Sequence, residues 1–205
     1  MAKKNYLWVF TALVVAVPLA VYGLVNWYQD RFQRLPVLGP QGHTISAFRF
    51  QNQAGQWITQ EDWNGKIVVA NYFFTHCPSI CPKMMYQLKR VQAYGGLKNL
   101  KLASFSVDPE RDSVARLRDY AAKFDVKEGW DLLTGAKKEL YRAARNSFLI
   151  TATDGDGGPE DFIHSENLVL IDTQKRIRGF YNGTAEAEVN QLIRDLKKLA
   201  EERPE

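Results

Sequence analysis

The chain has 205 residues, of which 45% are hydrophobic and 24% are charged. This balance is typical of a globular protein and argues against wholesale disorder. The sequence contains two cysteines, which excludes both a small disulfide scaffold and a four-cysteine zinc site. The formal net charge is +4, and because Lys3 and Lys4 supply half of it, no nucleic-acid partner is expected.

The first segment predicts a membrane anchor. Residues 6–27 carry no formal charge, and as a helix they are long enough to cross a bilayer. Lys3 and Lys4 precede this run, which places the N-terminus in the cytoplasm and the rest of the chain beyond the membrane. The short basic N-terminus favours a single-pass protein of the bacterial inner (cell) membrane, with its domain on the periplasmic or extracytoplasmic side. A cleaved signal peptide is the alternative.

The chain then divides into three parts. Residues 1–28 are the expected cytoplasmic N-terminus and transmembrane anchor, residues 29–43 a linker rich in proline and glycine, and residues 44–205 the folded domain. The domain opens with a predicted hairpin, 44–50 and 56–59, followed by the strand 66–75, the helix 82–93, the strand 100–107, the helices 113–124 and 137–148, the glycine-rich loop 151–160, the strands 167–172 and 177–181, and the helix 185–200. This order predicts an α/β fold with a mixed sheet flanked by helices.

Both cysteines lie where the strongest predicted strand gives way to a helix. Pro78 and Pro82 each follow a cysteine, and the second proline suits the first turn of a helix. Near a helix N-terminus, unpaired N–H groups stabilise a thiolate, which attacks disulfides or binds metal. The spacing of Cys77 and Cys81 permits both uses and slightly favours a soft metal over a disulfide. Two space-filling thiols and a permanent disulfide are the remaining alternatives.

Three histidines could complete a metal site. His43 precedes the hairpin and is expected in a solvated turn. His76 is next to Cys77 in an extended segment, so its side chain should point to the opposite face. His164 precedes the strand 167–172.

Four motifs stand out: Phe74-Thr75-His76-Cys77-Pro78-x-x-Cys81-Pro82, Ser106-Val107-Asp108-Pro109-Glu110-Arg111-Asp112, Trp130-x-x-Leu133-Thr134-Gly135 and His164-Ser165 before a strand ending at Asp172. With these motifs the chain resembles the SCO/SenC family of membrane-anchored, thioredoxin-like copper proteins that serve assembly of the copper site in cytochrome c oxidase. The resemblance implies a thioredoxin-like fold over nearly the whole exported domain.

The resemblance also implies a site. Cys77 and Cys81 would be thiolate ligands and His164 the imidazole ligand of copper, as Cu(I), Cu(II) or both. Asp108 would have an accessory role near the cysteines or toward a partner, although an aspartate before proline is also a good turn former. For Asp112, which precedes Ser113, the alternative to a chemical role is a cap of the helix 113–124. Motion of the loop 151–160 could bring His164 onto the cysteines when metal binds.

Two functions follow from this site. The first is a metallochaperone that delivers copper to the CuA site of cytochrome c oxidase during its assembly, which is not an enzymatic activity. Its partners would be the copper-bearing oxidase subunit, an upstream copper donor or thiol reductant, and the membrane. The second is a thiol–disulfide oxidoreductase that keeps the oxidase cysteines reduced, with Cys77 and Cys81 as its catalytic redox pair. Only the first requires His164. A peroxidase-like reductase is a third, less well matched reading.

Overall fold

The computed structural model describes residues 2–32, 34–94, 97–150 and 163–202. The chain forms two compact units, one comprising Met1–Leu35 with Glu202–Glu205 and the other Pro36–Glu201. The first unit contains the helix α1 (Ala2–Phe32). Its stretch Trp8–Tyr28 has a mean hydropathy of 2.2 and is not buried in the protein, so the helix is long and apolar enough to cross a membrane, as predicted.

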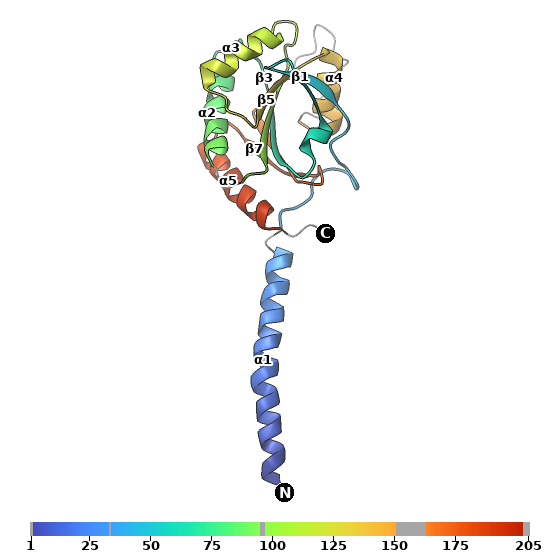
Figure 1. The fold of residues 1–205 in the computed structure, drawn as a ribbon, viewed down its shortest axis with the longest axis vertical. Helices are drawn as coiled ribbons and strands as arrows, with labels where there is room; N and C mark the ends of the chain where they lie inside the picture. Colours follow the sequence, from blue (N-terminus) through green and yellow to red (C-terminus); the bar gives the residue numbers. More distant parts are fainter. Residues whose placement is uncertain (1, 33, 95–96, 151–162, 203–205) are drawn as a thin grey trace. The chain divides into compact units, whose positions relative to one another are not determined.

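The second unit is built on one seven-stranded sheet (Figure 1) with the strand order β2-β1-β5-β4-β3-β6-β7. The strands are β1 (Arg49–Asn52), β2 (Trp57–Thr59), β3 (Ile67–Phe73), β4 (Leu100–Ser106), β5 (Trp130–Thr134), β6 (Asn167–Ile171) and β7 (Ile177–Asn182). The helices are the 3₁₀ turn η1 (Gln60–Trp63), α2 (Ile80–Ala93), α3 (Val114–Phe124), α4 (Lys137–Arg142), the π-helical turn η2 (Ala143–Ser147) and α5 (Glu186–Glu201).

The central strand β3 is buried on both faces, as its sequence, apolar except for Asn71, predicts. Successive side chains of a strand point to opposite faces. The Tyr72 hydroxyl accordingly donates to the Leu140 carbonyl of α4 at 3.3 Å, while the Phe73 ring lies 5.4 Å from the Tyr120 ring of α3. Figure 1 shows α2, α3 and α5 on one side of the sheet and α4 on the other. The predicted mixed sheet flanked by helices is confirmed.

The strands β3 and β4 run parallel, and their register pairs Phe73 with Ser106. The carboxyl ends of parallel strands meet at one edge of a sheet. The turn that follows β3 and the turn that follows β4 therefore leave the sheet side by side. The first turn carries the cysteines, and the second carries Asp108 and Asp112.

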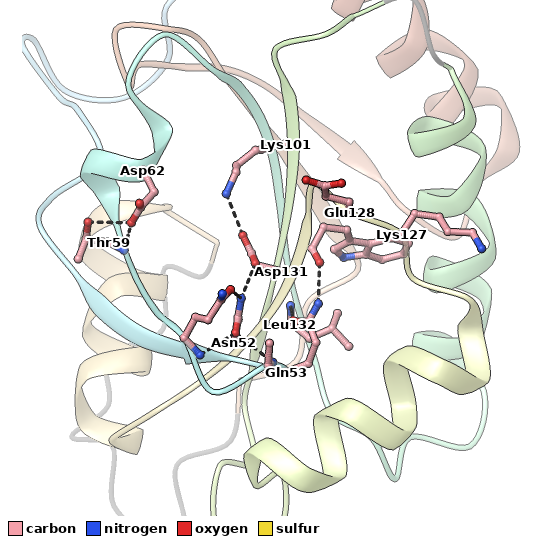
Figure 2. A network of polar contacts seen from close by, with 12 residues as sticks. Asn52, Gln53, Thr59, Asp62, Lys101, Lys127, Glu128, Asp131 and Leu132 are labelled. Carbon is pink, nitrogen blue, oxygen red and sulfur yellow. Dashed lines mark hydrogen bonds and ion pairs between the residues drawn. The ribbon is translucent and has the colours of Figure 1, made fainter.

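The strand β5 was not predicted. Its Asp131 is buried, and its carboxylate accepts hydrogen bonds from Asn52 Nδ2 at 2.9 Å and from Lys101 Nζ at 3.1 Å. The Leu132 N–H donates to the Gln53 side chain at 2.8 Å. Figure 2 shows these contacts, which join β5 to the end of β1, to the turn after β1 and to β4. A buried charge thus interrupts the apolar pattern of this strand, and partners distant in sequence stabilise it.

Other element boundaries differ from the prediction. The predicted hairpin is present, but its first strand begins at Arg49. The helix α2 begins at Ile80, two residues before Pro82. The predicted helix 137–148 is interrupted, because α4 ends at Arg142 and a π-helical turn follows.

The predicted linker, residues 29–43, overlaps the second compact unit from Pro36 onward. The Leu38 N–H donates to the Ile177 carbonyl at 2.8 Å, and the Ile45 N–H donates to the Lys175 carbonyl at 2.8 Å. These bonds attach the described residues 36–45 to the β6–β7 hairpin.

Candidate metal centre

The cysteine turn connects the end of β3 to the start of α2. The Cys77 N–H donates to the Phe74 carbonyl at 3.3 Å, which closes the turn. Cys81 is the second residue of α2, and its N–H donates to the Cys77 sulfur at 3.3 Å. The first N–H groups of a helix have no partner within the helix. The Cys77 sulfur therefore accepts one of them, while Ser79 at the N-cap position makes no side-chain cap bond within the described residues.

The two thiols have opposite pKa shifts. Partial burial opposes ionisation of Cys77, but the backbone N–H groups of Cys81, Ser79 and Ile80 outweigh it and lower the pKa of Cys77. Cys81 is buried, and that burial is the main cause that raises its pKa to about 12, with Cys77 and Asp112 adding to the increase. Both sulfurs are free thiols in this structure. Cys77 is thus the accessible and more acidic thiol of the pair.

A cavity of about 330 Å³ opens beside the cysteine turn. Cys77, Cys81 and His164 all line it, so the structure brings the three predicted ligands to one place. Its apolar wall consists of Tyr72, Phe73, Phe74, Ile80, Val107 and Ile163. Thiolate sulfur and imidazole nitrogen are donors that suit copper.

The three groups share a cavity without forming a coordination shell. Among the described residues, no group of three His, Cys, Asp or Glu side chains is close enough to hold a metal ion. His164 is exposed, whereas Ile163 beside it is buried. The predicted loop 151–160, which leads toward His164, lies outside the described residues. Binding of one metal ion by all three groups therefore requires His164 to approach the cysteines.

The other two histidines lie outside this cavity. His43 Nε2 is 2.8 Å from the Ser147 carbonyl oxygen, at the π-helical turn. His76 is exposed, and its Nδ1 lies 3.2 Å from the Thr75 hydroxyl. Neither lines the cavity.

The two aspartates of the turn after β4 differ in position. Asp108 is half-buried, lies outside the cavity lining and pairs with Arg111 at 3.7 Å. The alternative that Asp112 caps α3 is wrong, because the Ser113 side chain is the cap and accepts from the Arg116 N–H at 3.3 Å. Asp112 is instead fully buried and binds Thr75, two residues before Cys77. The sequence gives no local signal for this contact, because 37 residues separate the partners.

Tyr120 of α3 is a further group near the cysteines. Its hydroxyl is buried and has no hydrogen-bond partner within the described residues. Burial is the main cause that raises the pKa of the phenol, and the negative charges of Cys81, Cys77 and Asp112 add to it. The ring therefore lies close to the acidic groups behind the cysteine turn.

The chain is similar to known proteins in sequence and in fold. A family model described as SCO1/SenC matches residues 38–201. The SCO1 protein homolog of Bacillus subtilis (strain 168) is 30% identical over 165 residues, covering 78% of this chain and 85% of the relative. The solved structure of BsSco, a member of the Sco family of cytochrome c oxidase assembly proteins with an identified disulfide switch, is similar with a TM-score of 0.66 and 27% identity, over 82% of this chain and 99% of that one. Bradyrhizobium japonicum ScoI with copper bound has a TM-score of 0.61 and 25% identity, over 76% of this chain and 99% of that one.

Proposed function

Because the chain belongs to the SCO1/SenC family, we propose that it is a copper-binding metallochaperone that delivers copper to the CuA site of cytochrome c oxidase during assembly of that enzyme. The observation that carries the proposal is the convergence of Cys77, Cys81 and His164 on one cavity. The copper-bound ScoI structure supports the choice of metal. The predicted thioredoxin-like fold, confirmed by the SCO relatives of known structure, supplies the scaffold.

The two thiols would have different tasks in loading and release. Cys77 is partly exposed and has the lower pKa, so it would be the first sulfur to bind incoming Cu(I) and to meet the thiolate of a partner. Cys81 is buried and would bind second, with loss of its proton. Transfer would then proceed by ligand exchange, in which partner thiolates replace Cys77 before Cys81.

The apolar helix α1 would anchor the chain in the membrane that holds its oxidase partner. Lys3 and Lys4 precede the helix, which favours a cytoplasmic N-terminus and a domain on the extracytoplasmic side of a bacterial inner membrane. A single anchor would confine the search for a partner to the membrane surface.

The proposal is tested by anaerobic Cu(I) titration of the reduced full-length chain in detergent, in competition with a chromophoric chelator. We expect one tightly bound Cu(I) per chain, loss of binding on Cys77→Ser/Cys81→Ser, and affinity weakened roughly tenfold or more by His164→Ala. His76→Ala is the matched control, since this exposed histidine lies outside the cavity. A His164→Ala variant that binds like wild type would refute the three-ligand site.

A thiol–disulfide oxidoreductase is the second candidate. The acidic, accessible Cys77 and the neighbouring Cys81 favour it, and the disulfide switch of BsSco supports it. In this reaction the Cys77 thiolate attacks a partner disulfide, and Cys81 then displaces the reduced partner, so the pair is oxidised while the partner gains two electrons. Reduction of an oxidised CuA-domain peptide by His164→Ala at the wild-type rate, without copper binding by either chain, would favour this candidate over the first.

A further inference from the structure

Asp112 is a buried carboxylate with hydrogen bonds to two turns. It is completely inaccessible to solvent. One oxygen, Oδ1, accepts from the Thr75 hydroxyl at 2.6 Å, and the Thr75 N–H lies 3.2 and 3.3 Å from the two oxygens. The other oxygen, Oδ2, accepts from the Ser106 hydroxyl at 2.6 Å. A buried carboxylate requires such donors, because burial of an uncompensated charge is costly.

These bonds join the cysteine turn to the turn after β4. The Ser106 hydroxyl oxygen in turn accepts from the Asp108 N–H at 3.0 Å, and the Asp112 N–H donates to the Asp108 carbonyl at 2.9 Å. Asp112 therefore holds its own turn closed while its side chain reaches the neighbouring one. The parallel register of β3 and β4 places both turns at the same edge of the sheet.

The attachment is made just before the first cysteine. Thr75 contributes both its backbone N–H and its side chain, and its hydroxyl also accepts from Arg116 Nε at 3.2 Å. Cys77 follows two residues later, and its N–H closes a turn on the Phe74 carbonyl, directly before Thr75. The path of the chain into Cys77 is thus fixed on both sides of Thr75.

We propose that Asp112 is a positioning residue for the cysteine pair, which acts through Thr75 to hold the Cys77 sulfur at the distance from Cys81 that copper binding requires. This inference rests on the proposed function, because it takes the cysteine pair to be the copper site. Asp112 does not touch the metal. Groups that orient metal ligands typically alter affinity by 10–100-fold when removed.

The experiment compares full-length variants in detergent by two measurements: competitive Cu(I) affinity, and the equilibrium of the Cys77–Cys81 disulfide with glutathione. We expect Asp112→Ala to weaken Cu(I) binding about tenfold or more. The Cu(I) affinity of Asp112→Asn should lie between those of Asp112→Ala and wild type, because the amide keeps one acceptor oxygen. The equilibrium constant of the Cys77–Cys81 disulfide with glutathione should also change several-fold, more for Asp112→Ala than for Asp112→Asn. This is expected because disulfide formation also depends on the spacing of the sulfurs.

Two controls separate positioning from general destabilisation. Asp195→Asn alters another buried carboxylate, on α5, which accepts from the Tyr181 hydroxyl at 3.0 Å, and it should leave both measurements unchanged. If Asp112→Ala does not fold, Thr75→Val and Thr75→Ser test the inference instead. Thr75→Val removes the hydroxyl and should weaken copper binding, whereas Thr75→Ser keeps the hydroxyl and should bind copper like wild type. Wild-type copper affinity and disulfide equilibrium in Asp112→Asn and Thr75→Val would overturn the inference.

The experiment distinguishes failure of the proposed function from failure of the positioning role. If wild type binds no Cu(I), the metallochaperone proposal fails, and the glutathione equilibrium still tests whether Asp112 positions the sulfurs. If wild type binds Cu(I) and Asp112→Asn and Thr75→Val match it in both measurements, the positioning role alone is excluded.

Discussion

Cys77 and Cys81 belong to one turn but occupy different surroundings. Backbone N–H groups around Cys77 favour its thiolate, while burial disfavours the thiolate of Cys81. A thiol reacts as its thiolate, so the residue with the lower pKa reacts first at a given pH. This difference leads to a prediction that requires neither copper nor a partner.

In the reduced, metal-free chain, iodoacetamide should modify Cys77 well before Cys81. The rate at which Cys77 is modified should increase with pH, with an apparent pKa below the ordinary cysteine value. Cys81 should remain unreactive until the pH approaches about 12. The single variants Cys81→Ser and Cys77→Ser isolate each thiol, and mass spectrometry of quenched samples gives the rates. Equal rates at pH 8 would contradict the assignment.

Tyr120 carries a buried hydroxyl without a hydrogen-bond partner within the described residues. Burial of an unsatisfied polar group is destabilising, so Tyr120→Phe should leave the free energy of unfolding unchanged or raise it by up to about 1 kcal/mol. Tyr141→Phe is the matched control, since the Tyr141 hydroxyl donates to the Val107 carbonyl at 2.7 Å. It should lower the free energy of unfolding by about 1 kcal/mol. Urea denaturation measures the free energy of unfolding of both variants. A larger decrease for Tyr120→Phe than for Tyr141→Phe would be inconsistent with the structure.

Among the elements, the β6–β7 hairpin is the one that follows His164, and its turn contains a strained residue. Lys175 has φ = 65°, a left-handed conformation that a side chain disfavours and glycine adopts freely. The turn is fixed by the Lys175 N–H, which donates to the Asp172 carbonyl at 2.9 Å, and by the Asp172 N–H, which donates to the Arg176 carbonyl at 3.0 Å.

Lys175→Gly should therefore stabilise the chain by roughly 0.5–1 kcal/mol, since relief of strain exceeds the entropy that glycine loses on folding. Lys175→Val should have the opposite effect, because a β-branched side chain is most disfavoured at positive φ. The midpoint of thermal unfolding, measured for both variants, distinguishes them. A lower midpoint for Lys175→Gly than for wild type would count against strain at this turn.

The elements that the sequence predicts best are those with local patterns. The strand β3 is recognisable because its run from Ile67 to Phe73 is apolar except for Asn71. The strand β5 escapes prediction because Asp131 interrupts it, and the partners of that carboxylate are 79 and 30 residues away. The hydrogen bond between Asp112 and Thr75 could not be predicted for the same reason, since only the parallel pairing of β3 and β4 brings the two residues together.

At the scale of the whole molecule, the described residues include an apolar helix in the first compact unit and a seven-stranded sheet in the second. The motifs of the sequence predict which domain residues meet, and the cavity brings Cys77, Cys81 and His164 together. Among the described residues these three side chains are not close enough together to hold one metal ion. The sequence does not predict this separation, because it depends on how closely the residues just before β6 approach the cysteine turn.

The proposed orientation in the membrane predicts that Cys77 is labelled from outside the cell. A membrane-impermeant maleimide added to intact spheroplasts should modify the reduced full-length chain, and Cys77→Ser/Cys81→Ser should abolish the label. The apolar helix should also keep the chain in the membrane fraction after alkaline carbonate washing. Labelling that appears only after lysis would place the domain in the cytoplasm.

The hydrogen bond from the Cys81 N–H to the Cys77 sulfur makes the start of α2 dependent on the chemical state of one thiol. A disulfide or a bound copper ion changes the electron density on that sulfur and its position relative to the amide. The amide proton of Cys81 is thus a natural probe, whose exchange with solvent and NMR chemical shift should differ among the dithiol, disulfide and copper-loaded chain. A single backbone resonance can therefore follow loading and oxidation without any added label.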